Sequence, residues 1–187
     1  WIINLSTNMV AYPKCSNCKV HNGFYTAWNQ AKSTVNAQIQ NLLSLHRGVP
    51  IYVTGHSLGG ALATLAVGDL KETFGNIASL LTFGQPRVGN KEFAAYFASV
   101  IVANRVVHYA DIVPHIPPSS FGFSHQGNEI WYDKAMSTYK SCAPEANTCS
   151  NSLPATSLNT GDHSMDTYIT LPGSFFDRII KDLTEAV

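Results

Sequence analysis

The sequence predicts an α/β protein with a mostly parallel central sheet, helices on both faces of the sheet, and a single domain over residues 1–187. Short runs of β-branched and aromatic residues alternate with longer segments of helical periodicity, which is typical of βαβ units. The chain is long enough to bury a core of its own, and no linker or change in composition divides it.

The composition is typical of a globular domain and lacks the charge pattern of a nucleic-acid-binding protein. Hydrophobic residues make up 45% of the chain and charged residues 13%, with 12 basic and 12 acidic side chains. A disordered chain would need more charge and fewer aromatic residues. Binding to a phosphate backbone would need a basic stretch, and none is present, so we expect no nucleic-acid partner. The longest apolar run, residues 58–70, is shorter than the roughly 18 residues of a membrane span.

The first predicted elements are a long helix, a strand and a second helix. Apolar residues recur at helical spacing over residues 23–46, and the Arg-Gly pair at 47–48 supplies stop signals. Residues 51–54 form a β-branched and aromatic run that predicts a buried strand. Residues 58–74 are apolar on nearly every side, as expected for a helix buried against a sheet.

The alternation continues along the rest of the chain. We expect strands at 79–83, 105–109 and 128–132, and helices at 91–100 and 174–183. Residues 137–162 are rich in Ser, Asn, Thr and Pro, which predicts an irregular excursion over the surface.

Four cysteines form two close pairs in the sequence, Cys15 with Cys18 and Cys142 with Cys149. A zinc site would require distant loops to converge, and a redox C-x-x-C motif normally opens a helix beside a strand. Neither context is visible, because both pairs lie among turn-forming residues. We therefore favour two local disulfides, as in secreted proteins, over a metal or redox site.

The most informative motif is V-T-G-H-S-L-G-G-A at residues 53–61. A serine on a sharp turn from a strand to a helix has a strained backbone that exposes its hydroxyl, and the chain crosses itself closely there. Small residues are then needed two places before and after, where Gly55 and Gly59 flank Ser57. A phosphate-binding loop would need a lysine near the second glycine, and none occurs before Lys71. The motif predicts a nucleophilic serine.

A serine hydroxyl needs a neighbouring base, which a carboxylate holds in place. In this architecture the acid and then the histidine follow the serine in the chain. Asp111 comes two residues after the 105–109 strand, where the functional loops of open α/β sheets gather. Asp69 lies in the last turns of the buried helix and is interpreted as a helix-end charge. Asp133 is the weaker alternative, because little chain remains to bring a histidine back to it.

Seven histidines are candidates for the base. Chain order or placement argues against five of them: His21, His46, His56, His108 and His115. His125 and His163 remain. We favour His163, which follows the long excursion and precedes the terminal helix.

At these residues the chain resembles the fungal-type secreted lipases, the class 3 lipase family, which includes related feruloyl esterases. The matching segments keep the family's order over nearly the whole chain: W-I-I-N-L at 1, V-H-N-G-F at 20, T-G-H-S-L-G-G-A-L-A at 54, F-G-Q-P-R-V-G-N at 83, H-Y-A-D-I-V-P-H-I-P-P at 108 and G-D-H-S-M-D-T-Y at 161. The resemblance implies an α/β-hydrolase fold, Ser57 as nucleophile, Asp111 as acid and His163 as base. It also favours both disulfides.

The resemblance leads us to expect further elements before residue 1. In the family, the segment that matches residues 1–5 follows a strand that supplies one oxyanion-hole residue, and the lid and first strands lie in the same earlier region. We expect these elements to be missing from this chain. We also expect that a separate amino-terminal chain of the same protein supplies them as a partner. Within the chain, the N–H of Leu58 is the remaining oxyanion donor, directly after the nucleophile.

Together these residues predict a secreted carboxylic ester hydrolase that forms an acyl-enzyme and requires no metal or organic cofactor. Ile112, Val113, Ile116 and Phe121 belong to an apolar, proline-stiffened segment after the acid, which is either an acyl-binding wall or a packed loop. The wall favours a lipid ester, and thus a triacylglycerol lipase. A feruloyl or other aryl esterase is the alternative on the same scaffold, and an inert fragment acting in binding or assembly is less favoured.

Overall fold

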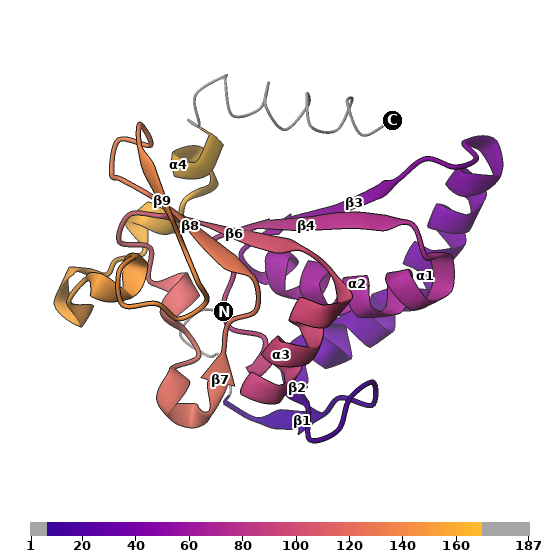
Figure 1. The fold of residues 1–187 in the computed structure, drawn as a ribbon, viewed down its shortest axis with the longest axis horizontal. Helices are drawn as coiled ribbons and strands as arrows, with labels where there is room; N and C mark the ends of the chain where they lie inside the picture. Colours follow the sequence, from indigo (N-terminus) through magenta and orange to yellow (C-terminus); the bar gives the residue numbers. More distant parts are fainter. Residues whose placement is uncertain (1–6, 170–187) are drawn as a thin grey trace.

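A central five-stranded sheet with the order β3-β4-β6-β8-β9 organises residues 7–169, the part of the chain that the computed structural model describes (Figure 1). Its strands are β3 (Ile51–His56), β4 (Ile77–Phe83), β6 (Ala103–His108), β8 (Asn128–Tyr132) and β9 (Tyr139–Cys142). The first four run parallel and β9 pairs antiparallel with β8. The mostly parallel sheet expected from the alternation of elements is confirmed.

Three helices lie on one side of this sheet (Figure 1). α2 (Leu58–Phe74) packs on β3 and β4, α1 (Asn22–Leu45) packs on α2, and α3 (Lys91–Val100) lies beside α2. α2 is buried on most sides because it lies between the sheet and α1. The short α4 (Met165–Ile169) is near the end of the sheet formed by β8 and β9. The terminal helix predicted at 174–183 lies outside the described residues.

The element boundaries agree closely with those expected. The predicted elements at 58–74, 91–100 and 128–132 match α2, α3 and β8. β3 runs two residues further than the predicted 51–54 strand, because its pairing with β4 continues to the His56–Phe83 pair. Residues 137–162 are mostly irregular, but they contain the edge strand β9, whose polar sequence Y-K-S-C carries no strong strand signal.

A second, antiparallel sheet was not expected from the sequence. It has the order β1-β2-β5-β7 and consists of very short strands: β1 (Met9–Ala11), β2 (Lys19–His21), β5 (Gly89–Asn90) and β7 (Phe123–Ser124). It lies on the far side of the helices from the central sheet (Figure 1). Strands of two or three residues are too short for a periodic pattern to be visible.

Both predicted disulfides are confirmed. The Cα atoms of Cys15 and Cys18 are 5.5 Å apart, and those of Cys142 and Cys149 are 6.3 Å apart. The first closes the turn between β1 and β2, and the second joins the end of β9 to the irregular segment. Over residues 7–169, no group of three or more potential ligand side chains could hold a metal ion, and no helix could span a membrane.

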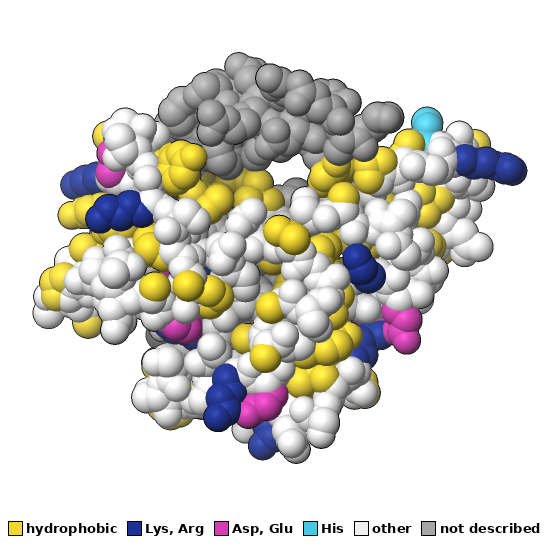
Figure 2. All heavy atoms as spheres, in the orientation of Figure 1, with side chains coloured by type: hydrophobic (Ala, Val, Ile, Leu, Met, Phe, Trp, Pro, Cys, Tyr) yellow, Lys and Arg dark blue, Asp and Glu magenta, His cyan; other side chains and the backbone are white. Residues whose placement is uncertain are grey.

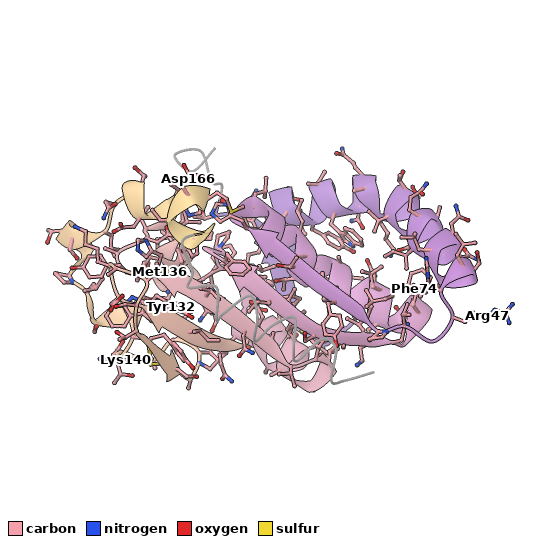
Figure 3. All side chains as sticks on the ribbon, turned by 90° about the horizontal axis from the view of Figure 1, so that it is seen from above. Arg47, Phe74, Tyr132, Met136, Lys140 and Asp166 are labelled. Atoms are coloured by element: carbon pink, nitrogen blue, oxygen red, sulfur yellow. A yellow bond between two sulfur atoms is a disulfide. The ribbon has the colours of Figure 1, made fainter. Side chains whose placement is uncertain are left out.

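The hydrophobic core has two parts, one on each face of the central sheet. The larger part, on the side of α2, includes Trp28, Leu65, Leu80 and Phe93. The smaller part, on the opposite face, combines Val106, Tyr132, Met136 and Tyr168. Tyr132 and Met136 lie near Asp166 of α4 at one end of the sheet, away from Arg47 and Phe74 at the other (Figure 3). On the face shown in Figure 2, basic and acidic side chains are scattered, without a large patch of one sign.

Candidate active site

Ser57 lies on the turn between β3 and α2 in a strained backbone conformation, with φ 56° and ψ −128°. A Cβ atom on Gly55 would lie 2.4 Å from the backbone carbon and oxygen of Gly59, so only glycine fits at position 55. Apart from its chain neighbours and the nearby backbone of its own helix, a Cβ atom on Gly59 would meet no described atom within 4 Å. The predicted need for a small residue is therefore confirmed at Gly55 and wrong at Gly59, whose own Cβ direction is open.

Asp111 follows the end of β6 and is completely buried. Its Oδ1 accepts a hydrogen bond from the N–H of Val113 at 2.8 Å. Its Oδ2 accepts from the hydroxyl of Tyr168 at 2.5 Å and lies 2.9 Å from His163 Nδ1. The backbone of Asn159 bonds on both sides of the acid, to the Ala110 carbonyl and from the Ile112 N–H. The end of the irregular segment is thereby fixed to the turn that carries the carboxylate.

His163 lies between the acid and the serine. Its Nε2 is 2.7 Å from Ser57 Oγ, and its Nδ1 is 2.9 Å from Asp111 Oδ2. Because an ionised carboxylate can only accept, Nδ1 carries the proton and Nε2 is free to accept from the serine hydroxyl. Gly84, at φ 54°, leaves room for this pair, since a Cβ there would lie 2.8 Å from Asp111 Oδ2. The structure thus brings together three residues that the sequence separates widely.

This arrangement can transfer a proton from the serine to the imidazole. The serine and histidine are each 9% exposed, and the buried carboxylate is placed to stabilise a cation on His163. Leu58 is the first residue of α2, and its N–H lies at the end of the helix where the dipole favours negative charge. An oxygen anion that forms near Ser57 would be stabilised there.

The rival residues of the sequence argument have other partners. Asp69 accepts from the Trp28 indole at 2.6 Å and forms ion pairs with Lys14 and Lys32, each at 3.0 Å. Asp133 accepts from Ser137 and Thr138 in a turn. His125 is buried, with its Nε2 2.7 Å from the Pro114 carbonyl oxygen. Within residues 7–169, none of these three side chains forms a hydrogen bond with Ser57.

Two residues at this site were not recognised from the sequence. Tyr168 donates to Asp111 and accepts from the N–H of His108 at 3.1 Å, and burial, followed by the Asp111 charge, raises the pKa of its phenol well above the usual range. His56 does not bond Ser57, as expected, but its ring contacts His163. Both residues lie within the quoted motifs, yet only the packing of distant segments shows what they touch.

The apolar segment after the acid is held by hydrogen bonds. Arg87 donates from Nη1 to the His115 carbonyl at 2.6 Å and from its backbone N–H to the Ile116 carbonyl at 2.9 Å. Val113 has no exposed surface, so its assignment to a substrate-binding wall is corrected: its side chain belongs to the protein interior. Ile112 and Ile116 are partly exposed, and Phe121 is 58% exposed. These three side chains remain available to a ligand.

Comparison with known proteins identifies clear relatives. The model of the family "Lipase (class 3)" matches residues 1–121. The lipase of Rhizomucor miehei is 40% identical over 167 residues, which cover 84% of this chain and 46% of that protein. Secreted mono- and diacylglycerol lipase 1 of Fusarium solani is 37% identical over 134 residues, covering 71% of this chain and 40% of that protein.

Solved structures show the same similarity to lipases. Lipase II from Rhizopus niveus superposes with a TM-score of 0.82 at 39% identity, covering 87% of this chain and 63% of that chain. The chain therefore spans about half the length of the curated relatives it matches.

Proposed function

The chain belongs to the class 3 lipase family and has the α/β-hydrolase fold, and from this premise we propose that it carries the catalytic site of an ester hydrolase. In this proposal Ser57 is the nucleophile, His163 the general base and Asp111 the acid that orients it. The observation that carries the proposal is the continuous chain of hydrogen bonds, 2.7 Å from Ser57 Oγ to His163 Nε2 and 2.9 Å from His163 Nδ1 to Asp111 Oδ2.

The proposed reaction is acyl transfer to water. His163 accepts the Ser57 proton as the serine oxygen attacks the ester carbonyl, and the N–H of Leu58 stabilises the oxyanion. The imidazolium then returns its proton to the departing alcohol. Water, deprotonated by the same imidazole, releases the acid from the acyl-enzyme. Asp111 keeps the proton of His163 on Nδ1, so that Nε2 is available in both steps.

We propose a lipid ester, a triacylglycerol, as the substrate. The named relatives are lipases, and the accessible side chains of the segment that follows the acid in the chain, Ile112, Ile116 and Phe121, are apolar. Apolar side chains of this kind suit a ligand that is itself largely hydrocarbon.

We further propose that the protein is secreted and that residues 1–187 belong to one domain. Two disulfides persist best outside the reducing cytosol, and one relative is named as secreted. A continuous core supports the single domain, because it joins Val20 of the small sheet to Leu80 of the central sheet.

The substitution Ser57→Ala tests the proposed mechanism. With the protein expressed from its complete open reading frame, we expect hydrolysis of p-nitrophenyl butyrate to fall by at least about 10⁴-fold, because no other group can form the acyl-enzyme. Covalent labelling by a fluorophosphonate should also be lost. Ser99→Ala, at an exposed serine of α3, serves as the control and should keep the wild-type rate. An unchanged rate in Ser57→Ala would remove this serine from the mechanism.

The substrate class is tested separately. We expect faster hydrolysis of emulsified triacylglycerol than of methyl ferulate. The reverse preference would assign the same site to aryl esters and would leave the proposed acyl transfer unaffected.

A further inference from the structure

His56 makes two contacts with His163 that the mechanism above does not use. Its Nε2 lies 3.1 Å from the backbone carbonyl oxygen of His163. Its ring also stacks on the His163 ring, with centroids 4.7 Å apart and an angle of 26° between the ring planes. One side chain thus contacts both the backbone and the imidazole of the proposed base.

The first contact determines which nitrogen of His56 carries the proton. A carbonyl oxygen can only accept, so Nε2 of His56 donates. Burial, and next the positive charge of a protonated His163, lower the pKa of His56, while the bond to the His163 carbonyl and the Asp111 charge oppose this shift. The lowered pKa disfavours a second positive charge on the stacked rings when His163 takes up a proton.

The position of His56 in the fold gives this contact its importance. His163 lies on a single 3₁₀ turn, residues 161–163. Two hydrogen bonds join this turn to residues near Asp111 in the structure. His108 Nδ1 lies 3.1 Å from the Asp162 carbonyl oxygen, and the Asn159 side chain donates to the Asp162 carboxylate at 2.8 Å. Among the hydrogen bonds of the described residues, only two join this turn to the end of β3, namely those of His56 and Ser57 with His163.

The bond between Ser57 and His163 must change during the reaction, since its proton moves. The bond from His56 does not take part in the chemistry, and His56 immediately precedes Ser57 in the chain. A bond from residue 56 to the backbone of residue 163 can therefore stay in place while the proton is transferred, and it joins the base to the end of the strand next to the nucleophile.

From these contacts we infer that His56 is a positioning residue, which holds the turn of His163 against the strand that carries Ser57. The inference rests on the proposed function and deepens it, because the residue acts through His163 and not on the substrate. Small displacements of reacting groups are costly, since a shift of about 1 Å lowers a rate by up to about 10²-fold.

Three substitutions separate the N–H donor from the ring. His56→Phe keeps a flat ring and loses the donor, His56→Asn has an amide too short to reach the carbonyl, and His56→Gln places an amide N–H at a similar distance. We expect kcat for p-nitrophenyl butyrate to fall about 10- to 100-fold in the Phe and Asn variants, with KM changed less than about twofold. The Gln variant should recover at least about tenfold of the loss.

The measurement uses the protein expressed from its complete open reading frame, with thermal unfolding to verify folding of each variant. His46→Gln, at an exposed histidine after α1, is the matched control and should be unchanged. If the Phe variant does not fold, the comparison of Asn with Gln gives the same answer. Wild-type kcat in the Phe and Asn variants, or equal impairment of Asn and Gln, would overturn the inference.

The proposed function fails in a different way. If Ser57→Ala retains the wild-type rate in the same assay, the acyl-transfer mechanism is wrong whatever the His56 variants do. If Ser57→Ala is inactive and His56→Phe and His56→Asn are unimpaired, only the positioning role is wrong.

Discussion

At position 57 the backbone adopts a conformation that a serine rarely adopts, with φ 56°. The cost is of order 1–3 kcal/mol, so the surrounding structure must hold it. The Ser57 N–H donates to the Phe83 carbonyl at 2.9 Å, and Gly55 allows the start of α2 to approach the end of β3. The outward direction of the hydroxyl is therefore a property of close backbone packing around one residue.

This packing predicts opposite effects of two glycine substitutions. Gly55→Ala would place a Cβ 2.4 Å from the backbone of Gly59, which no side-chain movement can relieve, so we expect the free energy of unfolding to fall by about 3 kcal/mol or more. Gly59→Ala adds a Cβ in open space within a helix, and should raise stability by up to about 1 kcal/mol. Urea unfolding of both variants measures the difference. Equal destabilisation by the two substitutions would show that the turn is not packed as described.

The irregular segment after β9 is held to the rest of the molecule by an ion pair. Glu145 accepts from Arg87 Nε at 2.7 Å and Nη2 at 2.9 Å, and also from the His125 N–H at 2.8 Å. Burial alone would raise the pKa of Glu145, but the bonds from Arg87 outweigh it and hold the pKa well below its usual range. The same arginine bonds the apolar segment after the acid, so one side chain connects two loops near the site.

Glu145→Gln should therefore destabilise the protein strongly, although glutamine has nearly the same volume as glutamate. The Arg87 side chain is only 5% exposed and would lose its charged partner, so we expect the free energy of unfolding to fall by about 2–5 kcal/mol. The matched control is Glu92→Gln, whose partner Lys91 is 84% exposed and 3.9 Å away, with an expected change within about 0.5 kcal/mol. Similar small losses in both variants would show that the ion pair does not anchor the segment.

For the molecule as a whole, buried histidines make stability depend on pH. Burial, and next the charges of Arg105 and Arg87, lower the pKa of His125 well below 6.5. The unfolded chain takes up a proton on this residue near pH 6.5, whereas the folded chain does not, so the unfolded state binds more protons below that pH. The contribution of His125 to stability is fully present above pH 6.5 and is lost as the pH falls toward its folded value.

We expect the free energy of unfolding to decrease from pH 7.5 to 5.0, with a slope of up to about 1.4 kcal/mol per pH unit from His125 alone. His56 and His115, whose pKa values burial also lowers, act in the same direction. His125→Gln keeps an N–H donor for the Pro114 carbonyl and should make the dependence on pH shallower. Urea unfolding of both proteins across this range measures it. An unchanged slope in the variant would mean that His125 is not held neutral by the fold.

Much of the fold could be predicted from the sequence because its signals lie within a few residues of each other. Residues 58–74 are apolar on nearly every side and residues 91–100 have a helical pattern, and both features depend only on residues that are close together in the sequence. The turn at Ser57 is equally local, since it was predicted from Gly55, Ser57 and Gly59 together with the strand before them and the helix after them. Asp111 and His163 were candidates because chain order and strand ends limit where an acid and a base can lie.

Only the tertiary structure decided which distant groups touch. The pairing of the short strands β1, β2, β5 and β7, the bonds of Glu145 with Arg87 and the contacts of His56 and Tyr168 with the acid and the base all join segments far apart in the chain. Such contacts depend on the angle and distance at which whole elements dock. A local pattern of residues determines that an element forms, but the packing of several elements determines what each of its side chains meets.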